Sequence, residues 1–401
     1  MKEWHGYPEQ VVMVRYGEIF LKSEPVKYHF IGILLRNIKN ALSAAGLACR
    51  FETPRGRIII HGTDPAAIAR IVSRVFGVVD VSVCTLTGTD PASLCAGAVA
   101  LASAHVTAPM RFAVRAKREK KTGMNSQEMG ACIGSAICDR VPGLRVDLTA
   151  PEYEVFVEVR EIGGLVCDAR IPAPGGLPWG SQGKVLALLS SGIDSPVASW
   201  LAMKRGCEVS CLHMDGGQWA GGDVRAAAIE NFRRLSLWCP GNRIRMIIAD
   251  SELLYDRMQE LRTPPRFRCV ICKRFMIQVV SRFCAREKAR AIVTGENLGQ
   301  VASQTLANLA VISEAATVPV LRPLITYDKT ETVALARKIG TFVAKPGDLA
   351  CHVVPAMPAT AADFDTVKRY EDLLDIRGLL DHALLSETEV IAENGTIEEN
   401  I

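Results

Sequence analysis

Two cysteines three positions apart, Cys269 and Cys272, are followed directly by the cations Lys273 and Arg274. A thiol pair at this spacing could form a disulfide, hold a zinc ion, ligate an iron–sulfur cluster or pack in a core. The chain contains 13 cysteines, so one such pair can arise by chance and the spacing alone is a weak signal. The surrounding sequence must decide between these chemistries.

A second chemical feature is the Ser- and Gly-rich segment LLSSGIDSPVA, at residues 188–198. It joins an apolar run to a helical pattern, so its backbone N–H groups and a helix N-terminus would point at one place and could bind phosphate. It has neither the G-K-[ST] of a Walker loop nor a G-x-G-x-x-G. Asp194 and Ser195 are the side chains that could reach pyrophosphate or its magnesium ion. An ordinary strand-to-helix turn with a capping aspartate is the alternative.

Alternating strands and helices from residue 184 onward must position these segments. The expected strands, mostly apolar as in sheets buried on both faces, are 184–191, 208–215, 243–250 and 291–297. The expected helices are 195–206, 223–239 and 273–289. This order predicts a doubly wound parallel sheet, which binds ligands at the carboxyl ends of its strands. The segment VTGENLGQVASQT at 293–305 also starts at such an end, so Gly295 and Gln304 are expected in the same nucleotide site.

The chain before this sheet contains smaller α+β patterns. We expect a first α+β domain over residues 1–60 and a second over 61–170. A linker rich in Pro and Gly follows at 171–183, then a catalytic α/β domain at 184–377. Residues 378–401 hold six acids and no Lys or Arg, which predicts an acidic tail on a basic body and hence a polyanionic partner. A merely soluble surface is the alternative.

Composition limits the class of protein. A chain of 401 residues that is 49% hydrophobic and 22% charged is typical of soluble globular proteins. It has no apolar run long enough to cross a membrane. The odd number of cysteines argues against a secreted disulfide scaffold, and the polar start MKEWHGYPEQ against a signal peptide. We therefore expect a cytoplasmic enzyme without a membrane partner.

Several segments in chain order resemble the tRNA 4-thiouridine synthetase family (ThiI, tRNA uridine 4-sulfurtransferase). They are VRYGEIFLK, PRGRIII, FAVRAKR, IPAPGGLPWGSQGKVLALLSSGIDSPVASWLAMKRG, TGENLGQVASQT and PVLRPLITYDKTE. The resemblance covers residues 11 to 360 and includes S-[SG]-G-x-D-S, the signature of PP-loop ATP pyrophosphatases. It implies an N-terminal ferredoxin-like domain, a THUMP domain that binds tRNA, and a PP-loop domain. The implied reaction uses ATP with Mg²⁺ to adenylate O4 of tRNA uridine 8. Sulfur then displaces AMP to give 4-thiouridine.

The resemblance also implies site residues. The implied ATP contacts are Leu188, Leu189, Ser190, Ser191, Gly192, Ser195, His213, Met214, Lys273, Gly295 and Gln304. Asp194 matches the family's loop acid, and Lys329 matches the lysine needed for activation, where it would offset phosphate charge as AMP leaves. Lys273 stands where many members have Arg, which leaves the geometry of that contact open.

Cys351 resembles the sulfur-handling cysteine of the family's catalytic domain. In many members it forms a disulfide with a persulfide cysteine of an appended rhodanese domain. The segment after Cys351 is too short for that domain and holds no cysteine, so we expect this carrier to be absent. The resemblance then implies that Cys269, Cys272 and Cys351 hold a [4Fe–4S] cluster whose open iron takes sulfide.

Cations near the C-x-x-C pair, Lys273, Arg274 and Arg268, are expected to favour thiolates. Three alternatives to the cluster remain. They are a structural zinc with His352 as a further ligand, a persulfide on Cys351, and simple packing with no metal.

The segment RFAVRAKREKK at 111–121 predicts a strand that runs into a basic loop. Its six cations are expected to contact tRNA phosphates, unless they form only a solvated face: Arg111, Arg115, Lys117, Arg118, Lys120 and Lys121. Arg15, Lys22, Arg55 and Arg57 could extend this patch.

Other functions compatible with the sequence are an amide-forming PP-loop synthetase, an inactive RNA-binding THUMP protein, and thiolation of another tRNA position such as 2-thiouridine. The resemblance further implies a homodimer and a sulfur donor, either sulfide or a cysteine desulfurase that bears a persulfide. Supply of sulfur for thiamine is also open.

Overall fold

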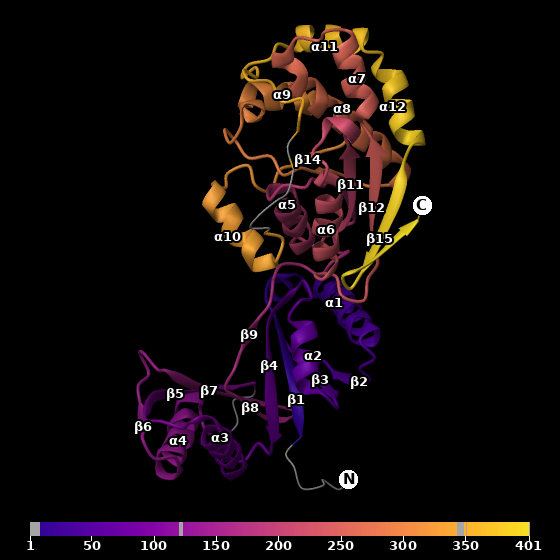
Figure 1. Cartoon of the computed structure of the whole chain (residues 1–401). Helices are drawn as coiled ribbons and strands as arrows, with labels where there is room; N and C mark the ends of the chain where they lie inside the picture. Colours follow the sequence, from indigo (N-terminus) through magenta and orange to yellow (C-terminus); the bar gives the residue numbers. More distant parts are fainter. Residues whose placement is uncertain (1–8, 120–122, 343–348, 350, 401) are drawn as a thin grey trace. The chain divides into compact units, whose positions relative to one another are not determined.

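The computed structural model describes residues 9–119, 123–342, 349 and 351–400. The chain divides into two compact units, one that ends at Gly176 and one that begins at Leu177, within the expected linker. Each unit is built on one β-sheet (Figure 1). In the described ranges, no helix is both long and apolar enough to cross a membrane.

The first unit contains nine strands and four α-helices in its described part. The strands are β1 (Gln10–Tyr16), β2 (Cys49–Glu52), β3 (Ile58–Gly62), β4 (Val78–Thr87), β5 (Met110–Arg118), β6 (Leu144–Val146), β7 (Tyr153–Arg160), β8 (Gly163–Cys167) and β9 (Ile171–Pro172). The helices are α1 (Glu24–Ala44), α2 (Pro65–Val72), α3 (Pro91–His105) and α4 (Ser126–Arg140), with a 3-10 turn η1 (Glu18–Leu21) before α1.

A single sheet runs through the whole first unit in the order β2-β3-β1-β4-β8-β7-β5-β6. The two α+β patterns are joined because the long strand β4 pairs with β1 on one side and with β8 on the other. Helix α2 and strand β4 therefore belong with the first layer, beyond the border at residue 60 that the sequence suggested. Helix α4 follows its N-cap Asn125, which forms a capping box with Glu128.

The second unit contains the parallel sheet. Its strands are β10 (Lys184–Leu188), β11 (Glu208–Asp215), β12 (Ile244–Asp250), β13 (Ile292–Val293), β14 (Val320–Leu321), β15 (Thr388–Glu393) and β16 (Thr396–Asn400). Its helices are α5 (Asp194–Lys204), α6 (Val224–Ser236), α7 (Glu252–Glu260), α8 (Arg268–Glu287), α9 (Leu306–Glu314), α10 (Lys329–Ile339), α11 (Phe364–Leu373) and α12 (Ile376–Leu385). Short 3-10 turns are η2 (Gly217–Trp219), η3 (Pro265–Phe267) and η4 (Ala302–Gln304).

The strand order β14-β13-β10-β11-β12-β15-β16 confirms the expected doubly wound arrangement. Strands β10 to β14 are mutually parallel, and the order reverses between β10 and β13. Helices α5 and α6 contact β11. Helix α8 contacts β10 and β13, and it also packs against α9, α11 and α12. The turns after β10 and β13 therefore border the crevice where such sheets bind ligands.

The acidic segment 378–401 is not a separate tail, so that prediction is wrong. It completes α12 and then forms the antiparallel strands β15 and β16, which extend the sheet from β12. Val390 and Ala392 are buried against the core, while the acid Glu389 pairs with Arg245 of β12 over 2.9 Å. The acids thus form the polar face of edge strands and meet basic partners there.

Candidate functional site

The turn after β10 is braced by its own hydroxyl groups. The backbone N–H of Ser190 donates to Oγ of Ser195 over 2.8 Å, and the two hydroxyl oxygens lie 2.9 Å apart. Asn231 of α6 donates from Nδ2 to the carbonyl oxygens of Ser190 at 3.1 Å and Gly192 at 3.2 Å. The turn leads into α5, whose first N–H groups have no acceptor within the helix and favour an anion. The structure thus shows the braced strand-to-helix turn that the motif predicts.

The turn after β13 approaches this first turn so closely that residue 295 must be glycine. A Cβ on Gly295 would lie 2.6 Å from the backbone N of Ser195 and 2.8 Å from the carbonyl carbon of Asp194. Neither neighbour is the end of a flexible side chain, so a larger residue would push the two turns apart. The two sequence motifs therefore form one site.

Two neighbouring cavities share Leu188, Ser190 and Met276 in their walls. The first, about 220 Å³, is lined by these expected site residues: Leu188, Ser190, Gly192, Asp194, Ser195, Lys273, Gly295 and Gln304. The second, about 230 Å³, is lined by the others: Leu188, Leu189, Ser190, Ser191, His213, Met214 and Cys351. The two cavities together therefore contain every expected ATP contact. Cys351 lines the second of them as well.

Lys329 and Asp194 meet at the edge of the first cavity although the sequence separates them widely. Nζ of Lys329 lies 2.9 Å from Oδ1 and 3.0 Å from Oδ2 of Asp194. Gln300 donates from Nε2 to the same carboxylate over 3.0 Å. The Lys329 side chain is 47% exposed, so it can exchange this partner for a bound phosphate. Gln300 was missed by the sequence reasoning, although it lies inside the TGENLGQ motif.

A buried carboxylate, Glu296, holds two cations at the wall of the first cavity. Its oxygens lie 3.1 Å from Nζ of Lys273 and 2.7 Å from Nε of Arg322. Burial raises the pKa of Glu296, but the charges of Lys273 and Arg322 outweigh this effect and lower the pKa. The group of Glu296, Lys273 and Arg322 therefore carries one net positive charge, and Lys273 and Glu296 of this group line the cavity. Glu296 and Arg322 were also missed, because only the fold brings them together.

Two buried polar atoms in these walls have no hydrogen-bond partner among the described residues, Nε2 of His213 and Oε1 of Gln304. Nδ1 of His213 lies 2.9 Å from the carbonyl oxygen of Leu189, so Nδ1 must be the donor. Burial lowers the pKa of His213, which keeps the ring neutral and makes Nε2 an acceptor. Unpaired buried atoms of this kind are costly without a ligand, so both are positioned to recognise one.

The C-x-x-C pair lies at the start of α8 and adjoins Tyr255, which lines the second cavity. Sγ of Cys272 is 3.1 Å from the hydroxyl oxygen of Tyr255. Cys351 lines the same cavity, forms an isolated β-bridge with Ala220 and is exposed. Burial, and to a smaller extent the charge of Cys351, raises the pKa of both Cys269 and Cys272, that of Cys272 to about 12. The three thiols are thus electrostatic neighbours.

The expectation that nearby cations favour thiolates holds only for Lys273, whose charge lowers the pKa of both cysteines by less than burial raises it. Arg274 points away into the core, where it donates from Nε to Glu371 over 2.8 Å with both side chains buried. Lys273 is paired with Glu296, and Arg268 donates to Gln259 over 2.6 Å. Burial outweighs the charge of Lys273, so the neutral thiols are favoured.

The predicted basic strip is only partly free. Arg111 pairs with Asp147 at 3.3 Å and Glu152 at 3.2 Å. Arg115 pairs with Glu154 at 2.7 Å. Lys117 is exposed, and the described residues give it no acidic partner; Arg118 lines a cavity of about 380 Å³ between α4 and the sheet. Lys120 and Lys121 lie outside the described residues.

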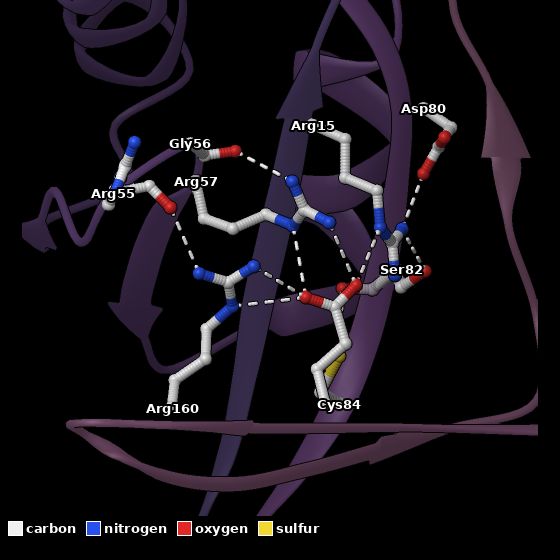
Figure 2. A network of polar contacts seen from close by, with 9 residues as sticks. Arg15, Arg55, Gly56, Arg57, Asp80, Ser82, Cys84 and Arg160 are labelled. Atoms are coloured by element: carbon white, nitrogen blue, oxygen red, sulfur yellow. Dashed lines mark hydrogen bonds and ion pairs between the residues drawn. The ribbon is translucent and has the colours of Figure 1, made fainter. Parts of the chain in front are cut away.

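Arg15 and Arg57, which could have extended this patch, belong instead to a network around Glu158 (Figure 2). Arg15 is buried and donates to Asp80, to Ser82 over 2.9 Å, and to Glu158 over 3.3 Å. Glu158 of β7 also accepts from Arg57 at 3.0 Å and from Arg160 at 2.8 Å. The network joins β1 and β4 to β7 and is structural.

Comparison with known proteins gives three family matches. The family described as thiamine biosynthesis protein (ThiI) matches residues 180–376. The ThiI ferredoxin-like domain matches residues 11–82, and the THUMP domain matches residues 89–166. Together these matches confirm the fold that the sequence predicts, with a PP-loop sheet after the two α+β parts.

Relatives and solved structures agree with the family matches. A probable tRNA sulfurtransferase of Methanobrevibacter smithii is 38% identical over 365 residues, 89% of this chain and 94% of the relative. Another from Methanothermobacter thermautotrophicus is 38% identical over 376 residues, 92% and 94% of the two chains. A solved 4-thiouridine synthetase–RNA complex with bound ATP matches with a TM-score of 0.85 and 30% identity, over 96% of this chain and 100% of that chain.

Proposed function

Because the chain belongs to the ThiI family, we propose that it is a tRNA sulfurtransferase that converts uridine 8 of tRNA to 4-thiouridine with ATP. O4 of the uridine attacks the α-phosphorus of ATP and releases pyrophosphate. A sulfur nucleophile then adds at C4, and AMP leaves with the former O4. Adenylation is needed because an unmodified carbonyl oxygen is a poor leaving group.

The observation that carries this proposal is that the Ser- and Gly-rich turn after β10 and the thiol of Cys351 line two adjoining cavities. The braced turn and the N-terminus of α5 would bind the phosphates, as such termini do elsewhere. Asp194 would hold the magnesium ion, and Lys329, released from Asp194, would offset charge on the departing groups. His213 and Gln304 would accept hydrogen bonds from the nucleotide. Cys351 lines the second cavity, where the activated base must receive sulfur.

The sulfur step is proposed to use a [4Fe–4S] cluster held by Cys269, Cys272 and Cys351. The donor set is suitable, because the three thiols are close enough for the charge of Cys351 to affect the other two. Cys351 is exposed and lines the second cavity, and Cys269 and Cys272 are partly buried. Among the described residues, no three metal-binding side chains already stand at ligating positions, so binding would draw Cys351 inward. When bound, such a cluster supplies an open iron to which sulfide can bind. Metal ligation would also deprotonate the thiols that burial keeps neutral.

The overall reaction is tested by incubating purified protein with unmodified tRNA, ATP, Mg²⁺ and sulfide, followed by nucleoside analysis. We expect 4-thiouridine at position 8 and release of AMP and pyrophosphate. Lys329→Met should strongly reduce formation of 4-thiouridine and of AMP with pyrophosphate, while tRNA still binds. Formation of 2-thiouridine, or of no thionucleoside with any sulfur donor, would contradict the proposal.

The cluster is tested separately by iron and acid-labile sulfide analysis of protein purified without oxygen. We expect about four of each per chain, as for one cluster, lost in Cys272→Ala but retained in Cys284→Ala on the same helix. Zinc near one per chain without sulfide would make the three cysteines structural. Thiolation from a persulfide-bearing cysteine desulfurase without either metal would make Cys351 the sulfur carrier.

Two further parts of the proposal concern partners. The basic strip of the THUMP part would bind tRNA, since Lys117 is exposed there while acids neutralise Arg111 and Arg115. We also propose a homodimer, which light scattering of the purified chain would detect. A monomer that is active at all concentrations would remove this second part only.

Whether the protein supplies sulfur for thiamine is testable by complementation of a thiamine auxotroph.

A further inference from the structure

The first unit contains a pair of thiols that the proposed reaction does not use. Cys95 of α3 and Cys132 of α4 face each other with their Sγ atoms 3.8 Å apart. Both are free thiols, and both are half-buried. A disulfide needs an S–S distance of about 2.05 Å, so about 1.8 Å of closure between two packed helices would join them.

The two cysteines differ in their access to small molecules. Cys132 lines the cavity of about 380 Å³ together with Met129, Ile133 and Arg118, whereas Cys95 is not part of that wall. A reagent that enters the cavity therefore meets Cys132 first, and Cys95 stands directly behind it.

The chemical environment supports this division of roles. Burial, with a further contribution from Cys132, raises the pKa of Cys95 to about 11. A thiol of this kind reacts slowly with a dilute reagent, because only the thiolate attacks. Its proximity to Cys132 compensates once a reactive sulfur is fixed 3.8 Å away.

We propose that Cys132 and Cys95 are an attacking and a resolving cysteine that form a reversible disulfide between α3 and α4. The Cys132 thiolate attacks a low-molecular-weight disulfide such as glutathione disulfide, and one glutathione leaves as its thiol. The Cys95 thiolate then attacks the mixed disulfide at the Cys132 sulfur. The second glutathione leaves, and the Cys95–Cys132 bond forms. The protein loses two thiol protons and two electrons, and the glutathione disulfide is reduced to two thiols.

One consequence concerns the cavity itself. A glutathione adduct on Cys132 would occupy the cavity, whereas the Cys95–Cys132 bond turns the sulfur toward α3 and clears it. The pair therefore prevents a bulky adduct from remaining in this part of the first unit. The proposed thiolation does not itself require these two cysteines.

Three other cysteines provide internal controls. Cys84 and Cys167 lie opposite each other on β4 and β8, but both are almost completely buried and out of reach. Cys138 is exposed on α4 and has no cysteine facing it among the described residues. It should therefore form an adduct that persists.

The test treats the folded full-length protein with glutathione disulfide and maps cysteine peptides by mass spectrometry without reduction. In the wild type we expect a Cys95–Cys132 disulfide and no lasting adduct at Cys132. Cys95→Ser should accumulate the adduct at Cys132, at least tenfold above wild type. Cys132→Ser should leave Cys95 unmodified, and Cys138→Ser should behave like wild type at the pair.

A lasting adduct at Cys132 in the wild type would overturn the role of Cys95. Absence of both adduct and disulfide, in the wild type and in Cys95→Ser, would overturn the pair altogether. Circular dichroism of each variant before oxidation checks that it is folded. Melting of the oxidised wild type gives a second readout: its Tm should exceed that of the reduced protein, and Cys95→Ser should show no such gain.

Discussion

Replacing Glu158 by glutamine should be the most destabilising single change of charge in the first unit. The carboxylate is buried and accepts hydrogen bonds from Arg57, Arg160 and Arg15 (Figure 2). Glutamine keeps the shape of the side chain but leaves three guanidinium groups without their common anion. Burial alone would raise the pKa of Glu158, yet Arg57 and Arg160 outweigh it and lower the pKa from 4.5 to about 2.

The size of the effect follows from that pKa. A difference of one pH unit between the folded and unfolded pKa corresponds to about 1.4 kcal/mol, so a fall from 4.5 to about 2 gives about 3 kcal/mol. Loss of one partner from a buried ion pair typically costs about 3–5 kcal/mol, which agrees. We therefore expect the free energy of opening of β1, β4 and β7 to fall by about 3 kcal/mol. Their amide hydrogens should then exchange roughly a hundredfold faster.

The same pKa predicts how stability changes with pH. Because the folded pKa lies below the unfolded one, the unfolded chain binds the proton first as the solution becomes acidic. The contribution of Glu158 is therefore present above pH 4.5 and is lost as the pH falls to about 2. Glu158→Gln should remove this acid-dependent part of the stability of the first unit.

Hydrogen exchange with mass spectrometry measures each strand separately, which suits a chain with two units. Glu230→Gln is the matched control, because Glu230 also pairs with two arginines and its pKa also falls to about 2. Its side chain is 35% exposed, however, so solvent screening should limit the loss to about 1 kcal/mol or less. Equal effects of the two substitutions, or unchanged protection of β7 in Glu158→Gln, would refute the reasoning.

Three further substitutions test the site and the RNA surface. Gly295→Ala should abolish ATP binding in calorimetry, because its Cβ would lie 2.6 Å from the Ser195 nitrogen, whereas Gly222→Ala, with open space around it, should bind normally. Lys329→Met should lower the rate of ATP cleavage by about a hundredfold or more, and Lys338→Met on the same helix should not; equal rates would exclude a role for Lys329 in charge stabilisation. Lys117→Gln should weaken tRNA binding and reduce its salt dependence by about one phosphate contact, and an unchanged salt slope would place the RNA elsewhere.

The parts of the fold that could be predicted are those with strong local signals. Apolar strands and Gly-rich turns at their ends indicated the parallel sheet and both turns of the site. The C-terminal hairpin was read as a tail because its acids appeared solvated. Only the fold shows that Glu389 meets Arg245, and that Val390 faces the core.

Side-chain partners were harder to predict than positions. Asp194 and Gly295 lie in local motifs and were found, whereas Asn231, which braces the turn from another helix, has no local signal. Arg274 follows the C-x-x-C pair directly in sequence, yet its direction on the helix takes it to Glu371 instead. Adjacency along a helix does not give adjacency in space, and this is why Lys273 affects the cysteines while Arg274 does not contact them.

The hairpin at the chain end has a consequence for synthesis of the protein. The first sheet is complete once β9 has left the ribosome, so the RNA-binding part can fold while translation continues. The seven-stranded catalytic sheet cannot be complete until its last residues emerge, because β15 and β16 form one of its edges. A transcript cut short before residue 388 would yield a chain with β12 as a bare edge strand. The unpaired backbone groups of β12 could then hydrogen-bond to strands of other chains, so the truncated product would be prone to aggregation.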